Sequence, residues 1–147
     1  MKQRELREEI IRAKIRRIED SVNFVKNNFP DKFKEFEGDR ILHTGIYKEI
    51  EFAIQNILDI CVVINSDLSL GSPETEDTIL DHLEKSKTLD KKITDKIRLM
   101  KRFRNILIHR YGDIDDKKAF DSINEGFDDF EQIVNEIENF LKKNKKK

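Results

Sequence analysis

Apolar residues recur every three or four positions along most of this chain, which is the spacing of an amphipathic α-helix. No stretch alternates apolar and polar residues with the period of two that a half-buried β-strand requires. The first helical pattern begins at Leu6 and stops before Pro30, a residue that cannot continue a helix. We therefore predict an all-α protein whose first long helix ends near this proline.

The centre of the chain carries the most hydrophobic pattern. Phe33 and Phe36 predict a short helical turn after the proline, and a second long helix is expected over residues 40–65. Within it, the stretch 52–64 is apolar almost all the way round. This helix should therefore be the central and most buried one.

Loop and capping residues predict a third, shorter helix. Residues 66–72 form the clearest loop, and Ser72 is then expected to cap a helix whose first position is Pro73. This helix should reach about residue 86. Three of its aliphatic side chains should face the core: Ile79, Leu80 and Leu83.

Two more helices complete the pattern. A fourth helix should begin after Asp90, which can cap it, and end at Gly112, where a C-terminal cap glycine is typical. The last helix is expected from about Asp115. Its apolar positions form a heptad pattern: Phe120, Ile123, Phe127, Phe130, Val134, Ile137 and Leu141. Together these elements predict an antiparallel bundle of four main helices plus a short extra helix.

Length and composition fit one such domain. The chain has 147 residues and a net charge of −1, and we expect a single domain over 1–147 with a basic, frayed tail from about residue 142. Its one cysteine, Cys61, falls in the apolar run and is expected in the core. The N-terminus is densely charged, and no apolar run has the roughly 20 residues that cross a bilayer. A cytoplasmic protein without membrane attachment is therefore expected.

The fourth predicted helix is strongly basic. From Lys91 to Arg110 it carries eight lysines or arginines and a single acidic residue, Asp95. A surface of this kind attracts the phosphates of RNA. The alternative is a solvated face that acidic side chains of neighbouring helices neutralise.

Three residues near the end of this helix combine charge with proton-transfer chemistry. Arg104 and Tyr111 project from a face that otherwise carries aliphatic side chains. The guanidinium must therefore meet an anion, or a buried carboxylate such as Asp59 or Glu51. His109 brings an imidazole, the side chain that exchanges protons near neutral pH. An arginine to bind phosphate and a histidine to move a proton are the minimum needed to cleave a phosphodiester.

Arg104 and His109 diverge on a regular helix. At ~100° per residue, they lie about 140° apart around the axis. Either the helix ends or distorts before His109, or a second copy of the chain completes the site. A two-fold axis beside the motif would place two copies of each residue around one cleft, so a homodimer is expected.

The motif resembles that of a known family. Arg104, His109 and Tyr111 match, position by position, the Arg-x4-His-x-Tyr pattern of the HepT toxins, which belong to the HEPN superfamily of small helical ribonucleases. The likeness extends over residues 10–140 and includes the connector 70–75.

The resemblance implies a metal-independent RNA endonuclease that acts as a symmetric dimer, with Arg104 and His109 as catalytic residues and no cofactor. The partner in that family is a minimal nucleotidyltransferase antitoxin, which is implied to transfer AMP to the hydroxyl of Tyr111. The supporting or RNA-contacting candidates are Asn105, Arg102, Arg110 and Lys101.

Two other interpretations use the same residues. One is a non-catalytic HEPN-type module that binds a nucleotide or a partner protein, and the other is a scaffold in which Arg104 has a structural role. Metal catalysis is poorly supported because His43 and His82 are isolated from other ligands in the sequence. We expect His43 at the surface or as a cap, and His82 facing solvent.

Overall fold

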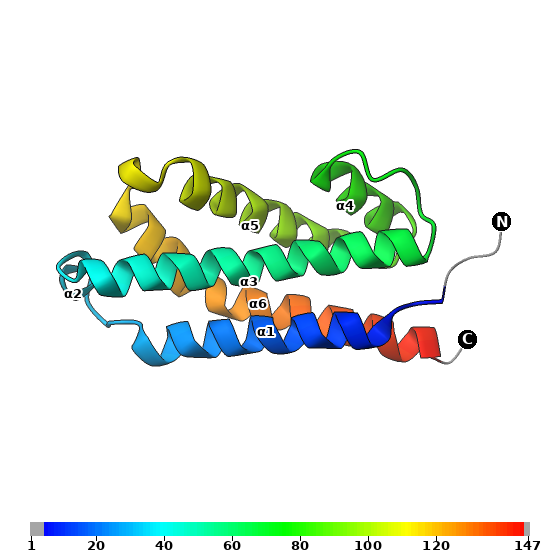
Figure 1. Cartoon of the computed structure of the whole chain (residues 1–147), viewed down its shortest axis with the longest axis horizontal. Helices are drawn as coiled ribbons and strands as arrows, with labels where there is room; N and C mark the ends of the chain where they lie inside the picture. Colours follow the sequence, from blue (N-terminus) through cyan, green and yellow to red (C-terminus); the bar gives the residue numbers. More distant parts are fainter. Residues whose placement is uncertain (1–4, 146–147) are drawn as a thin grey trace.

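The computed structural model describes residues 5–145 of the chain, and Figure 1 shows them as a bundle of helices. The elements are α1 (Glu8–Asn28), α2 (Phe33–Glu37), α3 (Arg40–Asp67), α4 (Glu76–Lys85), α5 (Lys91–His109), the 3-10 turn η1 (Tyr111–Asp113) and α6 (Asp116–Lys145). The described residues contain no β-strand. The predicted all-α class is therefore confirmed.

Four long helices, α1, α3, α5 and α6, form the body of the bundle, and each runs antiparallel to the next of the four (Figure 1). Helix α2 lies where α1 passes into α3, and α4 lies beside α5 at the opposite end. At that same end α1 begins and α6 ends, with Lys145 Nζ 3.4 Å from Glu8 Oε1. The antiparallel bundle is confirmed, and α6 remains helical past the predicted start of the tail near residue 142.

Helix α3 supplies the centre of the core, as predicted. Its Ile54, Ile57 and Ile60 are at most 1% exposed, and each such burial stabilises the fold by about 1.5–3 kcal/mol. Cys61 is also buried, and this burial raises the pKa of its thiol to about 12. The helix is not covered all round, however, because Phe52 is 45% exposed. One side of α3 therefore faces solvent.

An aromatic cluster holds the α2 end of the bundle. The Phe36 ring is fully buried, and its centroid lies 5.2 Å from that of Phe120 and 5.6 Å from that of Tyr47. Phe29, just before Pro30, stacks on Phe120 at 4.9 Å. Aromatic pairs at such distances add to the free energy of burial. The cluster therefore fixes the turn between α1 and α3 against α6.

The predicted start of α4 is wrong. The cap is Thr75, whose hydroxyl accepts a backbone hydrogen bond of 3.0 Å from the first turn, and not Ser72. Serine and threonine have the same capping chemistry, so the sequence alone did not distinguish them. The loop before Thr75 is held by Asn65 Nδ2, which donates to the Gly71 carbonyl at 3.0 Å. Pro73 consequently lies in this loop.

Helix α5 ends earlier than predicted. Asp90 caps its start as expected, accepting a backbone hydrogen bond of 3.0 Å, but its last residue is His109. Arg110 leaves the helical conformation with φ −121° and ψ 29°, and the 3-10 turn η1 follows. Gly112 does not have a positive φ and does not terminate the helix. Tyr111 therefore lies outside α5.

The last helix begins within one residue of its predicted start. Asp115 Oδ1 accepts a hydrogen bond of 3.1 Å from the Lys118 amide, so this carboxylate caps α6. Across residues 5–145, no helix has the length and hydropathy that crossing a membrane requires.

Candidate functional site

Arg104 is the most fully bonded side chain of the motif. It is 8% exposed, and its five N–H donors all have acceptors. Nη1 donates to Glu76 Oε2 at 2.8 Å and to Gln55 Oε1 at 3.0 Å, and Nη2 donates to Glu76 Oε1 at 2.8 Å. Nη2 and Nε both reach Asn105 Oδ1, at 2.7 and 3.2 Å. The guanidinium is therefore saturated within one chain.

The carboxylate that binds Arg104 differs from both candidates that the sequence suggested. Asp59 instead accepts from Gln55 Nε2 at 2.9 Å, and so orients the amide that binds the guanidinium. Glu51 pairs with a lysine of its own helix. Glu76 takes the role because it is the first residue of α4, which packs against α5.

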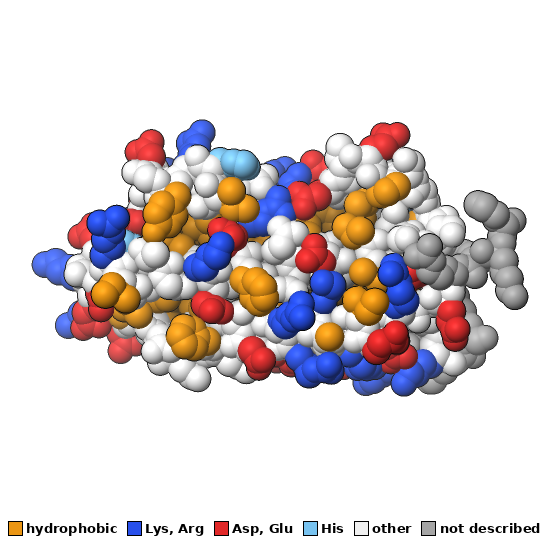
Figure 2. Space-filling view, viewed as in Figure 1, with side chains coloured by type: hydrophobic (Ala, Val, Ile, Leu, Met, Phe, Trp, Pro, Cys, Tyr) orange, Lys and Arg blue, Asp and Glu red, His pale blue; other side chains and the backbone are white. Residues whose placement is uncertain are grey.

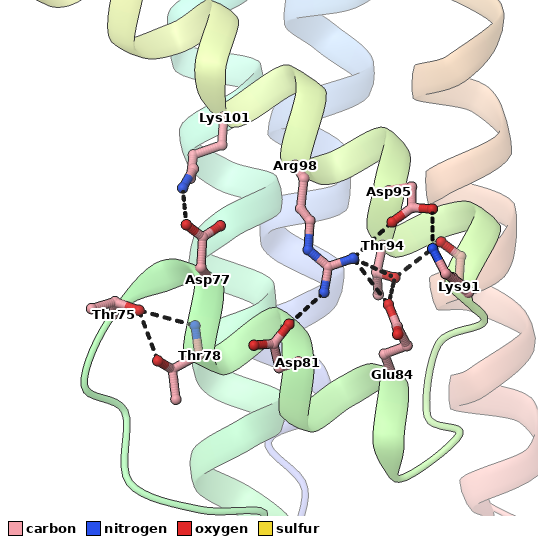
Figure 3. Close-up of polar contacts among 10 residues, drawn as sticks. All are labelled: Thr75, Asp77, Thr78, Asp81, Glu84, Lys91, Thr94, Asp95, Arg98 and Lys101. Atoms are coloured by element: carbon pink, nitrogen blue, oxygen red, sulfur yellow. Dashed lines mark hydrogen bonds and ion pairs between the residues drawn. The ribbon is translucent and has the colours of Figure 1, made fainter.

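Further ion pairs join α4 to α5 along the same side (Figure 3). Lys101 Nζ lies 2.7 Å from Asp77 Oδ2. Arg98, one turn earlier, contacts Asp81 Oδ1 at 2.7 Å and Glu84 Oε1 at 2.9 Å. The acidic residues of α4 therefore face the basic residues of α5 as a row of pairs.

Hydrogen bonding lowers the pKa of two carboxylates at this junction. Bonds from Thr94 and Arg98 hold the pKa of Glu84 below its usual value. A bond from Lys91 likewise lowers the pKa of Asp95. The junction between α4 and α5 is consequently charged on both sides at neutral pH.

Most of the positive charge of α5 is neutralised within the chain. Of the eight lysines and arginines from Lys91 to Arg110, five pair with a carboxylate: Lys91, Lys96, Arg98, Lys101 and Arg104. Within the described part of the chain, those without such a partner are Lys92, Arg102 and Arg110. Figure 2 shows cationic and anionic side chains interleaved over the visible face. Most of α5 therefore matches the alternative that the sequence left open, a face neutralised by acidic side chains of neighbouring helices.

His109 lies at the last position of α5 and is exposed. Its side chain makes no hydrogen bond or ion pair with any residue between 5 and 145, so its ring is free to meet a ligand. Arg104 contacts residues of α3 and α4, whereas His109 faces solvent. One chain therefore does not bring the two groups together, and α5 shows no distortion before His109.

Tyr111 projects from the turn after α5. It is 53% exposed, and its hydroxyl donates a hydrogen bond of 3.3 Å to Thr44 Oγ1 of α3. The ring borders a surface hollow of about 450 Å³ that Lys48 and Ile108 also line. The chain's other tyrosine, Tyr47, is buried and donates to Asp116 Oδ1 at 2.5 Å, and this burial raises its pKa. Of the two tyrosines, Tyr111 is therefore the one with an accessible hydroxyl.

The other two histidines have structural contacts. His43 Nδ1 lies 3.0 Å from the Phe36 carbonyl, which fits the expected capping role. His82 is half-buried, not solvent-facing as predicted, because its Nδ1 lies 3.0 Å from Asn65 Oδ1 and its ring covers Gly71. No group of three or more His, Cys, Asp or Glu side chains among residues 5–145 is arranged to hold a metal ion.

A groove lies on the exposed side of α5, bordered by α3 and α6. It encloses about 390 Å³. Leu99 and Ile106 line it and are 61% and 42% exposed, and Arg102 lies beside them. Arg102, which has no acidic partner among the described residues, therefore lies with Leu99 and Ile106 on the side of α5 that faces away from α4.

Sequence reasoning missed two residues of this site, Glu76 and Gln55. Glu76 was recognisable only as an acidic residue in the first turn of a helix. Gln55 and Asp59 stand one turn apart on α3, a spacing that suits an amide–carboxylate pair. Neither pattern indicates a contact with Arg104, because that contact depends on how α3, α4 and α5 pack.

A comparison with protein families identifies the family of this chain. The model of the family described as Ribonuclease HepT-like matches residues 11–137. No curated protein matches the chain in sequence.

Three solved structures share the fold. A tri-AMPylated HEPN toxin from Shewanella oneidensis, in complex with MNT antitoxin, has a TM-score of 0.81 and 22% identity, covering 88% of this chain and 97% of that one. A mutant MntA–HpeT toxin–antitoxin structure has a TM-score of 0.80 and 22% identity, and the match covers 88% of this chain and 98% of that one. YutE from Bacillus subtilis, a cytosolic protein of unknown function, has a TM-score of 0.67 and 18% identity, and the match covers 86% of this chain and 89% of that one.

The family match spans most of the chain, and the helical bundle is that of these structures. The resemblance inferred from the Arg-x4-His-x-Tyr motif is thus confirmed. This chain belongs to the Ribonuclease HepT-like family.

Proposed function

We propose that this chain is the toxin of a toxin–antitoxin pair and cleaves RNA in the cytoplasm without a metal ion. The observation that carries the proposal is the motif of Arg104, His109 and Tyr111, which stands at the end of α5 in a member of the HepT-like ribonuclease family. The exposed, unbonded ring of His109 supports it, because a proton-transfer group must be reachable by substrate.

In the proposed reaction, His109 acts as general base and takes the proton of a ribose 2′-hydroxyl. The 2′-oxygen attacks the neighbouring phosphorus, the bond from phosphorus to O5′ breaks, and a protonated imidazole supplies the proton to that leaving oxygen. The products are a 2′,3′-cyclic phosphate and a 5′-hydroxyl. Arg104 neutralises the charge that builds up on the phosphate oxygens, and Asn105 holds its guanidinium.

The proposed active unit is a homodimer. Arg104 and His109 point to different sides of α5. The two side chains of one chain are therefore poorly placed to contact the same phosphate. Leu99 and Ile106 give the exposed side of α5 an apolar surface that a second copy can bury. A two-fold axis there brings two His109 side chains to one cleft, one as base and one as acid. Arg102 and Arg110, which have no acidic partner in the described chain, would contact the RNA backbone, with Lys101 at the edge.

The proposed partner is a minimal nucleotidyltransferase that transfers AMP to Tyr111. The tyrosine oxygen attacks the α-phosphorus of ATP, the bond to the β-phosphate oxygen breaks, pyrophosphate leaves and the hydroxyl proton is lost. The exposure of the Tyr111 hydroxyl supports this modification. The product carries a phosphodiester near the motif, which would exclude RNA by its bulk and its charge.

The saturation of Arg104 favours a second candidate, a non-catalytic module that binds a nucleotide or a protein. In that case Arg104 is a structural group that joins α3, α4 and α5. A broad pool of single-stranded RNA distinguishes the two functions when it is incubated with the protein in excess EDTA. Cleavage by the wild type and its loss in a folded His109→Ala variant are expected. Binding of the pool without any cleavage would replace the ribonuclease by the binding module, and cleavage that requires an added divalent ion would exclude the metal-free mechanism.

A further inference from the structure

Glu76 binds Arg104 in the way that a phosphate would. Both carboxylate oxygens accept a bond of 2.8 Å, one from Nη1 and one from Nη2. This two-point fork is the geometry in which a guanidinium also binds two oxygens of a phosphate. The three other donor contacts go to Gln55 and Asn105. A phosphate therefore gains a two-point contact with Arg104 only if an existing acceptor leaves.

Of these acceptors, Glu76 is the one best placed to leave. Its side chain is 35% exposed, so the freed carboxylate can be hydrated. Asn105 is adjacent to Arg104 in the chain, and Gln55 is held by Asp59. A phosphate can also replace the charge of Glu76, which neither amide carries. Replacing the Glu76 carboxylate by a phosphate therefore keeps a negative charge beside Arg104.

Helix α4 does not have to move when Glu76 is released. It stays attached to α5 through Asp77, which pairs with Lys101, and through Asp81 and Glu84, which pair with Arg98 (Figure 3). The core side of α4 is also anchored, since Leu83 is fully buried. A rotation of the Glu76 side chain is therefore enough to open the guanidinium.

We infer that Glu76 is an internal competitor of RNA phosphate at Arg104, and that it sets the affinity of this site for RNA. This inference rests on the proposed function in one respect, that Arg104 receives a phosphate of the substrate. Wild-type protein binds RNA at this point only by displacing a carboxylate. Removing that charge should strengthen binding through Arg104, and through no other residue.

The test compares Glu76→Gln with Asp77→Asn. Each variant removes one negative charge from the first turn of α4, but Asp77 pairs with Lys101 and not with Arg104. The probe is a short fluorescein-labelled 2′-O-methyl oligouridylate, which cannot be cleaved because it lacks the attacking hydroxyl. Fluorescence anisotropy should show about tenfold tighter binding for Glu76→Gln, the effect of freeing a charge-assisted pair. Asp77→Asn, which removes an exposed charge, should change the affinity by about twofold or less.

The same two substitutions are then made in an Arg104→Ala background. The gain from Glu76→Gln should fall there to that of Asp77→Asn. Equal gains from both substitutions with Arg104 present, or a full gain without it, would overturn the inference. Glu76→Asp provides a second variant that keeps the charge but shortens the reach, and it should bind the probe with intermediate affinity. Circular dichroism and melting establish that each variant is folded.

Cleavage of an unmodified oligouridylate is measured alongside, so that the two proposals fail separately. Tighter binding by Glu76→Gln without any His109-dependent cleavage would remove the ribonuclease proposal and leave the competitor role of Glu76 standing. Cleavage by the wild type without tighter binding by Glu76→Gln would remove the competitor role alone. Failure of every variant to bind the probe, together with no cleavage by the wild type, would overturn both.

Discussion

Arg104 and His109 differ sharply in what they contribute to the fold, and this difference can be measured. The Arg104 side chain is 10% exposed and bonds to α3 and α4, whereas His109 is exposed and unbonded within residues 5–145. Replacing each by alanine should therefore separate a structural effect from a chemical one. We expect Arg104→Ala to lower the free energy of unfolding and His109→Ala to leave it unchanged.

The magnitude for Arg104→Ala follows from its partners. Breaking a fully buried pair costs about 3–5 kcal/mol because the orphaned charge stays dry. Glu76 is 35% exposed and can rehydrate, which brings the expected cost down to about 2 kcal/mol, within the range for hydrogen bonds to charged groups. For a chain of this length that loss corresponds to a Tm lower by about 4–8 °C. His109→Ala should lie within about 0.5 kcal/mol of the wild type, as for an ordinary surface substitution.

Urea unfolding followed by circular dichroism gives both values. All proteins are compared at one concentration, because dimerisation would link the apparent stability to it. A double-mutant cycle of Arg104→Ala with Glu76→Ala should give a coupling of about 1 kcal/mol. Equal stability of Arg104→Ala and His109→Ala, or a cycle without coupling, would refute the bonding scheme around Arg104. A marked loss of stability in His109→Ala would contradict its exposed position.

Two further outcomes are expected. Cys61 is 1% exposed and its pKa is raised to about 12, so the reactive thiolate is scarce at pH 8 and a disulfide reagent should label the protein in urea but not when folded; prompt labelling of the native protein would contradict the buried position. With the nucleotidyltransferase partner and ATP, intact mass should show added AMP on the wild type and on Tyr47→Phe, whose hydroxyl is buried, but not on Tyr111→Phe; equal labelling of Tyr111→Phe would move the modification to another residue.

The sequence predicted the helices well because helix formation depends on the local spacing of apolar and capping residues. The order of the helices, the cap at Asp90 and the burial of Ile79, Leu80 and Leu83 all follow from nearby residues. The errors also arose locally. Ser72 and Thr75 offer the same capping group three positions apart, and Gly112 suggested a cap that the 3-10 turn made unnecessary.

The candidate site was less predictable because it depends on packing between helices. The motif identified Arg104 and His109, but the acceptor for Arg104 comes from 28 residues away, on a helix whose placement no local pattern specifies. The same packing explains why α5 seemed more basic in sequence than it is in the fold. Its lysines and arginines meet carboxylates of α4 and α6, which a count of charges along one helix cannot include.

The chemical nature of the RNA ends tests the central claim most directly. An oligonucleotide with one ribose in an otherwise 2′-O-methyl chain is incubated with the protein in excess EDTA, and the products are identified by mass spectrometry. We expect a 2′,3′-cyclic phosphate on one fragment and a 5′-hydroxyl on the other, formed by the wild type and absent with His109→Ala. Fragments that carry a 3′-hydroxyl and a 5′-phosphate, or cleavage that His109→Ala retains, would contradict the proposed metal-free transfer through this histidine.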